Sequence, residues 1–153
     1  MTNNRIAGTY EVSAAAGYAG DVTPATAWKI LSENNDAVLI DVRTRAEWNY
    51  VGLPELAPIG KKPALLEWQV FPGMQQNPEF MSALGNAVAN KDTPLLFLCR
   101  SGARSAAAAR AMSAAGYSTC LNVRDGFEGP PDAQGRRGSE AGWKVAGLPW
   151  RQS

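Results

Sequence analysis

The chain alternates short, continuously apolar runs with segments in which apolar residues recur every three or four positions. Three of the runs are 37–42, 94–98 and 120–123, and each contains few polar side chains. Runs of this kind indicate strands whose two faces are both covered, as in the middle of a parallel sheet.

The segments between these runs predict helices. Residues 24–35 follow Thr23, which can cap a helix, and begin with Pro24, which is favoured in the first turn. Residues 103–115 are rich in alanine, so this helix can pack closely against a sheet, and Gly116 follows as its C-terminal cap. Two further helices are predicted, over 44–50 and over 78–89 with Asn77 as the cap.

Alternation of apolar strands with helices is typical of an α/β fold. We therefore predict a three-layer architecture, in which a parallel sheet of about five strands has helices on both faces. Residues 21–153 are expected to form this single domain, and residues 1–20, which have no firm period, an N-terminal arm or loose edge segment. In such sheets, ligands bind beyond the carboxyl ends of the strands.

Two regions are rich in glycine and proline and predict irregular structure. Residues 51–78 form a long connection with short extended pieces near 58–59 and 66–70, and long connections are often functional. Within it, Trp68, Phe71 and Met74 either line a pocket or pack the loop. Residues 126–142 predict a turn-rich loop, in which Arg136 and Arg137 are expected to be solvated surface, before a helical turn over 143–146.

Composition and charge exclude several classes of function. The net charge is +1 and charged residues make up 19% of the chain, so no broad field would recruit nucleic acid or a membrane surface. No run of about 18 apolar residues is present, nor the apolar core of a signal peptide, and a cytoplasmic location is expected. There is no histidine, which excludes Ser-His-Asp and Cys-His schemes; with two cysteines, neither a disulfide framework nor a zinc site is expected, and no cofactor is implied.

The candidate nucleophile is Cys99, which stands where the apolar run 94–98 stops and the helix over 103–115 begins. The free N–H groups of a helix N-terminus carry partial positive charge, so they stabilise a thiolate and bind an anion beside it. Gly102 allows a tight loop whose amides converge on one point. The loop predicts a nucleophilic cysteine in an anion-binding cradle, with a substrate-binding set of Arg100, Ser101, Gly102, Ala103, Arg104 and Ser105.

The other candidate residues have competing interpretations. Arg104 offers planar, charged donors for an oxyanion, or it braces the loop through a carboxylate. Asp41 ends the first apolar run near the same sheet edge, where it orients the loop or an arginine or caps the next helix. Cys120 lies within an apolar strand, which favours core packing over a role in the chemistry.

The sequence from Cys99 to Arg104 resembles the active-site loop of rhodanese-type sulfurtransferases. Leu39-Ile40-Asp41-Val42-Arg43 followed by Glu47-Trp48 resembles an early motif of that family. The segments 125–129, 142–143 and 147–149 resemble its end, so that the resemblance spans roughly residues 21 to 150. One departure is that Gly52 is followed by Leu53, where the family has a histidine.

The resemblance implies a sulfurtransferase that carries a persulfide on Cys99. The implied substrates are a small anionic donor such as thiosulfate and an acceptor such as cyanide or a thiol, with a protein thiol as a further acceptor that it allows. Two alternatives stay open. A cysteine phosphatase or arsenate reductase uses a similar cradle, but with Cys-x5-Arg in place of the Cys-x4-Arg of Cys99 to Arg104. A rhodanese-like binding module without turnover is the other, although such modules commonly lack the cysteine.

Overall fold

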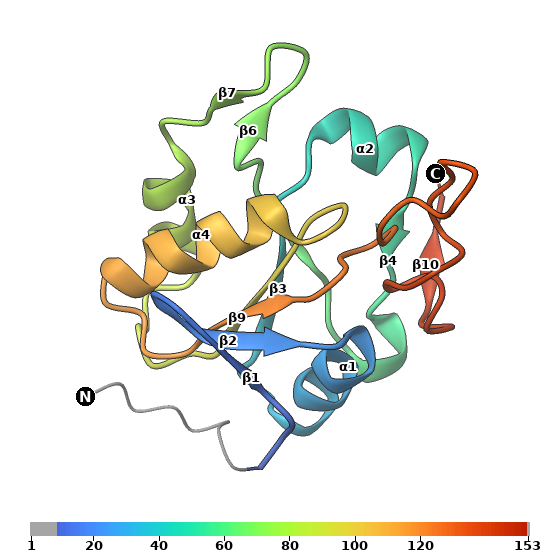
Figure 1. The fold of residues 1–153 in the computed structure, drawn as a ribbon. Helices are drawn as coiled ribbons and strands as arrows, with labels where there is room; N and C mark the ends of the chain where they lie inside the picture. Colours follow the sequence, from blue (N-terminus) through green and yellow to red (C-terminus); the bar gives the residue numbers. More distant parts are fainter. Residues whose placement is uncertain (1–8, 153) are drawn as a thin grey trace.

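The computed structural model describes residues 9–152, and it is built around a six-stranded sheet (Figure 1). The strands lie in the order β1-β2-β9-β8-β3-β5. The last five of these pair in parallel, and β1 adds to one edge in the antiparallel direction. The bounds are β1 (Ser13–Ala15), β2 (Tyr18–Val22), β3 (Val38–Asp41), β5 (Ala64–Leu65), β8 (Leu95–Leu98) and β9 (Cys120–Val123).

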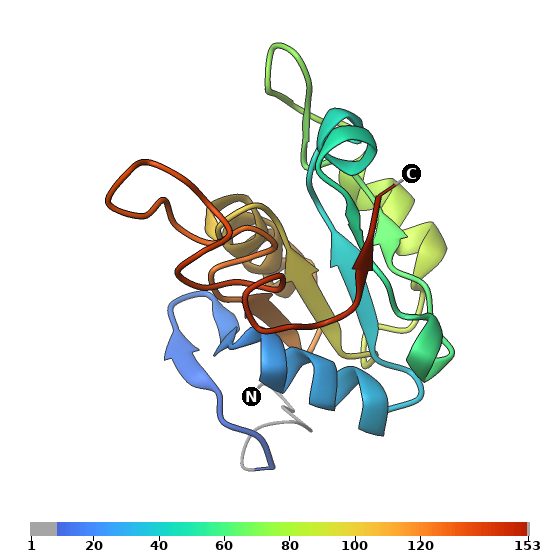
Figure 2. The ribbon, with the colours of Figure 1, turned by 90° about the vertical axis from the view of Figure 1, so that its right-hand side faces the viewer.

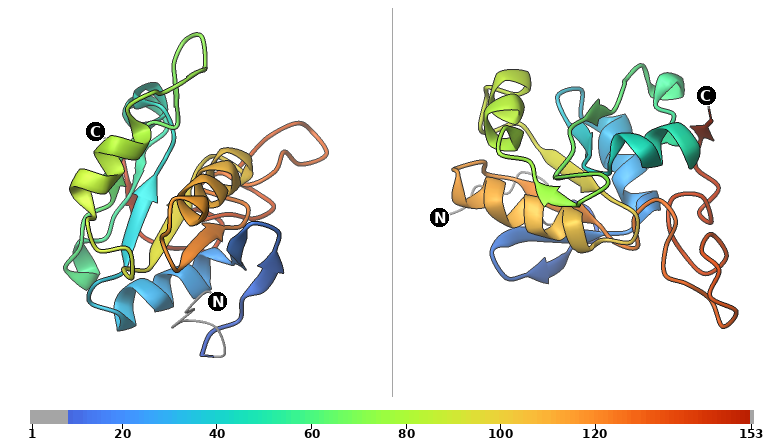
Figure 3. Two further views of the ribbon diagram at one scale, coloured as in Figure 1. Left: turned by 90° about the vertical axis from the view of Figure 1, so that its left-hand side faces the viewer. Right: turned by 90° about the horizontal axis from the view of Figure 1, so that it is seen from above.

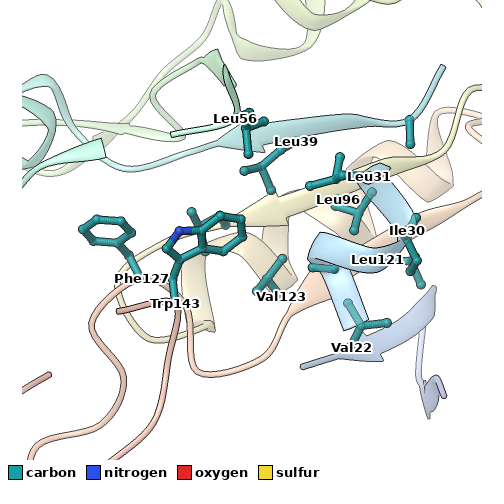
Figure 4. Packing of buried hydrophobic residues seen from close by; sticks show 13 residues of the cluster. Val22, Ile30, Leu31, Leu39, Leu56, Leu96, Leu121, Val123, Phe127 and Trp143 are labelled. Carbon is teal, nitrogen blue, oxygen red and sulfur yellow. The ribbon is translucent and has the colours of Figure 1, made fainter. Parts of the chain in front are cut away.

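Helices cover both faces of the sheet, which confirms the predicted three layers. On one face, α1 (Pro24–Glu33) packs with Phe127 and Trp143 over alternate strand residues such as Leu39 and Leu96 (Figure 4). On the other face, α3 (Phe80–Ala87) and α4 (Ala103–Ala114) cover the intervening residues, among them Phe97. All four residues of β8 are buried, as expected of a central strand.

The helix signals in the sequence hold where a capping side chain is present. Thr23 Oγ1 accepts the Thr26 N–H at 3.1 Å at the start of α1. Thr44 and Glu47 form a reciprocal capping box at the start of α2 (Arg45–Tyr50). The third helix is shorter than the predicted 78–89, because Asn77 Oδ1 accepts from Glu79 N in a turn and no side chain caps the helix itself.

The N-terminal arm predicted over residues 1–20 falls partly outside the described residues. Where the structure describes it, β1 and the start of β2 form a hairpin that joins the sheet, so these residues are an edge segment and not a loose arm. The helical turn over 143–146 is present, closed by Ala146 N donating to Gly142 O at 2.9 Å.

The long connection contains more structure than the sequence indicated. An extended piece near 58–59 was the wrong prediction, because Ala57–Ile59 forms a 3-10 turn that Gly60 ends with φ +71°. Of the extended piece predicted over 66–70, only β6 (Gln69–Val70) is a strand, and it forms a hairpin with β7 (Gln75–Gln76). A further pair, β4 (Leu53–Pro54) with β10 (Trp150–Arg151), ties the connection to the C-terminal segment.

The tip of the β6–β7 hairpin projects beyond the body of the domain, above the end of the sheet where α2 lies (Figures 1 and 2). The view from above shows α2 and the hairpin over this end, which is where β3 and β8 have their carboxyl ends (Figure 3). Within residues 9–152, no helix has both the length and the apolar character needed to cross a membrane.

Candidate active site

Cys99 directly follows β8 and lies at the carboxyl end of the sheet, one turn before α4. Its side chain is 1% exposed. The loop from Cys99 to Gly102 turns the chain sharply, and Gly102 adopts φ +113°, a conformation that residues with a Cβ rarely take. The strand and the helix therefore fix the position of the thiol, as the sequence predicted.

The Cys99 sulfur faces two hydrogen-bonding groups at the start of α4. Gly102 N–H donates to Cys99 Sγ at 3.1 Å, and Ser105 Oγ lies 3.2 Å from the same sulfur. An N–H group at a helix N-terminus favours negative charge on sulfur. The cradle predicted from the sequence thus has two of its members, Gly102 and Ser105, in contact with the thiol.

A second loop holds the Cys99 loop in place. Phe127 N donates to Cys99 O at 2.8 Å, and Glu128 N donates to Arg100 O at 2.9 Å. Gly126 has φ +61°, and a Cβ there would contact Cys99 O and the Arg100 carbonyl. The segment from Gly126 to Glu128 therefore supports the candidate nucleophile, a role that its resemblance to a family motif did not reveal.

Arg104 is paired with Glu47 of α2. Arg104 Nη1 and Nη2 donate to Glu47 Oε1 and Oε2 at 2.7 and 2.9 Å, and the two side chains are 15% and 18% exposed. Burial alone would raise the pKa of Glu47, but the hydrogen bonds and charge of Arg104 hold it below its usual value. Burial alone would lower the pKa of Arg104, but the hydrogen bonds and charge of Glu47 raise it above its usual value.

The pairing corresponds to the bracing interpretation of Arg104. Its side chain still lines the pocket beside Cys99, so anion binding by Arg104 stays a prediction. Glu47 was not expected as its partner, although the sequence placed Glu47 in a family-like motif.

Asp41 orients an arginine, but one outside the Cys99 loop. Asp41 accepts from Arg43 Nε at 3.0 Å and from Nη2 at 2.8 Å, and both side chains are fully buried. Arg43 Nη2 also donates to Gly52 O at 2.7 Å, and its guanidinium lies 4.3 Å from the centre of the Phe127 ring. The alternative role as a helix cap is not seen, because Thr44 caps α2.

Asn122 of β9 completes a buried polar chain behind the thiol. Ser105 Oγ lies 2.5 Å from Asn122 Oδ1, and Asn122 Nδ2 donates to Asp21 Oδ1 at 2.9 Å. Since Asn122 directs its amide N–H group to Asp21, its oxygen faces Ser105 and accepts the single hydroxyl proton. The sequence signal for this contact is Asn122 itself, a polar residue within the otherwise apolar run 120–123.

A pocket of about 720 Å³ opens above Cys99. Arg100, Ser101 and Ala103 line it next to the thiol, together with Arg137 from the 126–142 loop. Phe71 and Met74 line it from the hairpin tip, whereas Trp68 packs against Phe80 with ring centres 4.9 Å apart. Of the basic pair, Arg137 is half-buried, and the exposed Arg136 is not among the lining residues.

Cys120 lies in the core between the sheet and the α3–α4 face. Burial raises the pKa of its thiol to about 11, which leaves it neutral at physiological pH. Both features agree with the packing role predicted for it. Among residues 9–152, no three His, Cys, Asp or Glu side chains are grouped so that they could hold a metal ion.

Comparisons with known proteins place the chain in a family. The family model described as the STR4 middle domain matches residues 19–153. The chain is 39% identical over 126 residues to the Rickettsia prowazekii protein RP600, covering 82% of this chain and 91% of that protein, whose name gives no function. It is 30% identical over 132 residues to the rice chloroplast protein THYLAKOID RHODANESE-LIKE, a quarter of whose length is matched.

Solved structures agree with this placement. Rv0390 from M. tuberculosis superimposes with a TM-score of 0.83 at 46% identity, over 89% of this chain and 99% of that one. The polysulfide-sulfur transferase homodimer of Wolinella succinogenes has the same fold, with a TM-score of 0.58 at 23% identity over 87% and 78% of the two chains. The chain therefore belongs to the rhodanese-like family, in the group described as the STR4 middle domain.

Proposed function

We propose that this protein is a sulfurtransferase that moves sulfane sulfur from a donor such as thiosulfate to a thiophilic acceptor through a persulfide on Cys99. The observation that carries the proposal is the hydrogen bond from Gly102 N–H to the sulfur of Cys99, a residue that lines the pocket. The pocket brings substrate to the thiol, and the Gly102 N–H is a donor that stabilises negative charge on the sulfur.

In the first step, the Cys99 thiolate attacks the outer sulfur of thiosulfate. A bond forms between Sγ and that sulfur, the sulfur–sulfur bond of thiosulfate breaks, and its electron pair leaves with sulfite. The charges balance, because one thiolate and one dianion become one persulfide anion and one sulfite dianion. In the second step, a nucleophile takes the outer sulfur and the electron pair returns to Cys99.

The geometry favours sulfur transfer over the phosphatase alternative. A phosphatase needs the arginine of its loop to grip a phosphoryl group with both donors. Here Arg104 already donates one N–H from each Nη to Glu47, at 2.7 and 2.9 Å, so gripping a phosphoryl group with this pair of nitrogens would compete with the ion pair. The N–H groups of the short Cys99 loop are available to donate hydrogen bonds to the single outer sulfur of a persulfide.

Intact mass after exposure to thiosulfate is the direct test. Wild-type protein is expected to gain one sulfur atom and to transfer sulfur to cyanide, and Cys99→Ser is expected to do neither. Cys120→Ala is the matched control, since it removes the second thiol away from the pocket. A Cys99→Ser protein with near-normal transfer would refute the proposal, as would hydrolysis of an aryl phosphate that depends on Cys99.

A further inference from the structure

The pocket above Cys99 is far larger than thiosulfate or cyanide. Its volume of about 720 Å³ is typical of pockets that enclose organic ligands the size of a drug. Thiosulfate or cyanide would occupy only the space next to the sulfur. The remaining walls are therefore available to a larger substrate.

One wall is apolar and exposed. Tyr50 of α2 is 83% exposed, and Phe71 and Met74 at the hairpin tip are 58% and 37% exposed. All three line the pocket, although they come from two separate elements. Large apolar side chains that gather beside a site while exposed to water mark a ligand-binding surface.

A second part of the lining is charged, with more basic than acidic residues. Arg104 and Glu47 neutralise each other, which leaves Arg100 and Arg137 against Glu128 among the remaining charged lining residues. Glu128 also interacts with Lys144. Burial lowers the pKa of Lys144, and the negative charge of Glu128 opposes that shift. Arg137 Nη1 donates to Gly129 O at 2.7 Å, so this guanidinium is held in place with further N–H groups to offer.

We infer that the acceptor in the proposed reaction is an organic thiol with an apolar body and an anionic group. The inference rests on the proposed function and adds the chemical class of its second substrate. The body lies against Phe71, Met74 and Tyr50, and the anionic group pairs with Arg137 and Arg100. The thiol sulfur then reaches the outer sulfur on Cys99.

The transfer balances without an oxidant or reductant. The acceptor thiolate attacks the outer sulfur of the Cys99 persulfide, and a new sulfur–sulfur bond forms as the bond to Sγ breaks. The electron pair of the broken bond stays on Sγ, which regenerates the Cys99 thiolate. The product is the persulfide anion of the organic thiol.

Single-turnover discharge of preformed persulfide tests this inference. The protein is loaded with thiosulfate, freed of excess donor and mixed with one of four thiols: 6-mercaptohexanoate, 6-mercaptohexanol, mercaptoacetate or 2-mercaptoethanol. The first has both an apolar body and a carboxylate, the second only the apolar body, the third only the carboxylate, and the fourth has neither. The half-saturating concentration of 6-mercaptohexanoate is expected to lie about tenfold below those of the other three.

Two variants assign the two walls. Phe71→Ser should raise the half-saturating concentration about fivefold for the thiols with a six-carbon body. Arg137→Gln should raise it about tenfold for the thiols with a carboxylate. The matched controls are Met81→Ser, an exposed apolar residue of α3 outside the lining, and Arg136→Gln, the exposed neighbour of Arg137.

Binding of hexanoate, which has no thiol, separates this inference from the proposed function. Chemical-shift changes that saturate with hexanoate and weaken in both wall variants support the inference even if no persulfide forms, in which case only the proposed function fails. Persulfide that discharges equally to all four thiols overturns the inference and leaves the function intact. Absence of both hexanoate binding and persulfide overturns both.

Discussion

Arg104 and Glu47, 57 residues apart in the sequence, form a two-point ion pair that joins the start of α4 to α2. Glu47 Oε1 also accepts the Thr44 N–H at 3.1 Å, so the same carboxylate caps α2 and holds Arg104. The Cys99 loop is thereby tied to the element that bears Tyr50, one wall of the pocket.

The ion pair is expected to contribute to stability as a unit. Glu47→Gln and Arg104→Ala should each lower the free energy of unfolding by roughly 1.5–3 kcal/mol, the range for hydrogen bonds to charged groups, less some screening because both side chains are partly exposed. Urea unfolding of both single variants and the double variant measures the coupling. Losses that simply add would show that the pair contributes nothing as a pair.

The same pair predicts a pH dependence of stability. Arg104 lowers the pKa of Glu47 in the folded protein against the ordinary value of 4.5, so the unfolded chain binds this proton first as pH falls. The contribution of Glu47 is then complete above pH 4.5 and is lost as pH drops through the lower folded pKa.

Unfolding free energies of the wild type and Glu47→Gln, measured from neutral pH downward, check this sign. Their difference should shrink below pH 4.5. A difference that grows on acidification would contradict it. Arg45→Gln, an exposed arginine at the start of α2, is the control for a general change of charge.

Part of this arrangement could be predicted from the sequence, and the limit has a physical cause. Cys99 and its loop were identified because an apolar strand, a glycine and a helix start are local signals. The partners of Arg104 and Ser105 were not, because Glu47 and Asn122 reach them through pairings of strands and helices far apart in the chain. Periodicity fixes which face a residue takes, but not which side chain it meets there.

The long connection shows the same limit for the fold. Its β4, β6 and β7 strands are two residues each and are held by partners, such as β10, that their own residues do not indicate. Proline and glycine signalled turns there, and Gly60 does end one. The apolar residues Phe71 and Met74 could be placed in the connection, but their position on a pocket wall depended on the hairpin.

The Ser105 hydroxyl is expected to serve Cys99 during sulfur transfer. It has one proton, which Asn122 Oδ1 accepts at 2.5 Å, while Cys99 Sγ lies 3.2 Å away. When the sulfur is charged, rotation of the hydroxyl would exchange its hydrogen bond to Asn122 for a charge-assisted one to the sulfur. Ser105→Ala should therefore slow persulfide formation by roughly 10–100-fold, the equivalent of about 1.5–3 kcal/mol.

This rate is measured by mixing the protein with thiosulfate, stopping the reaction after set times and determining the persulfide fraction by mass spectrometry. Ser105→Thr keeps a hydroxyl and should retain more of the rate than Ser105→Ala if the folded structure is preserved. An unchanged rate in folded Ser105→Ala would remove Ser105 from the chemistry and leave it a packing role.

The last prediction concerns Gly126, which supports the Cys99 loop from behind. A Cβ at this position would collide with Cys99 O and the Arg100 carbonyl, and the backbone holds φ +61°. Gly135 has a similar φ of +80° but nothing within 4 Å of a Cβ, so it carries the conformational cost without the collision. Gly135→Ala should cost about 1–2 kcal/mol, the ordinary penalty for a left-handed residue with a Cβ.

Gly126→Ala should cost more than Gly135→Ala and should also displace the loop. Because Phe127 N and Glu128 N hold the carbonyls of Cys99 and Arg100, a shift at Gly126 moves the sulfur away from the Gly102 amide. Persulfide formation should therefore fall in folded Gly126→Ala and stay near the wild-type rate in Gly135→Ala. Equal stability and equal rates for the two variants would mean that the loop absorbs the extra carbon, and that Gly126 is not what positions Cys99.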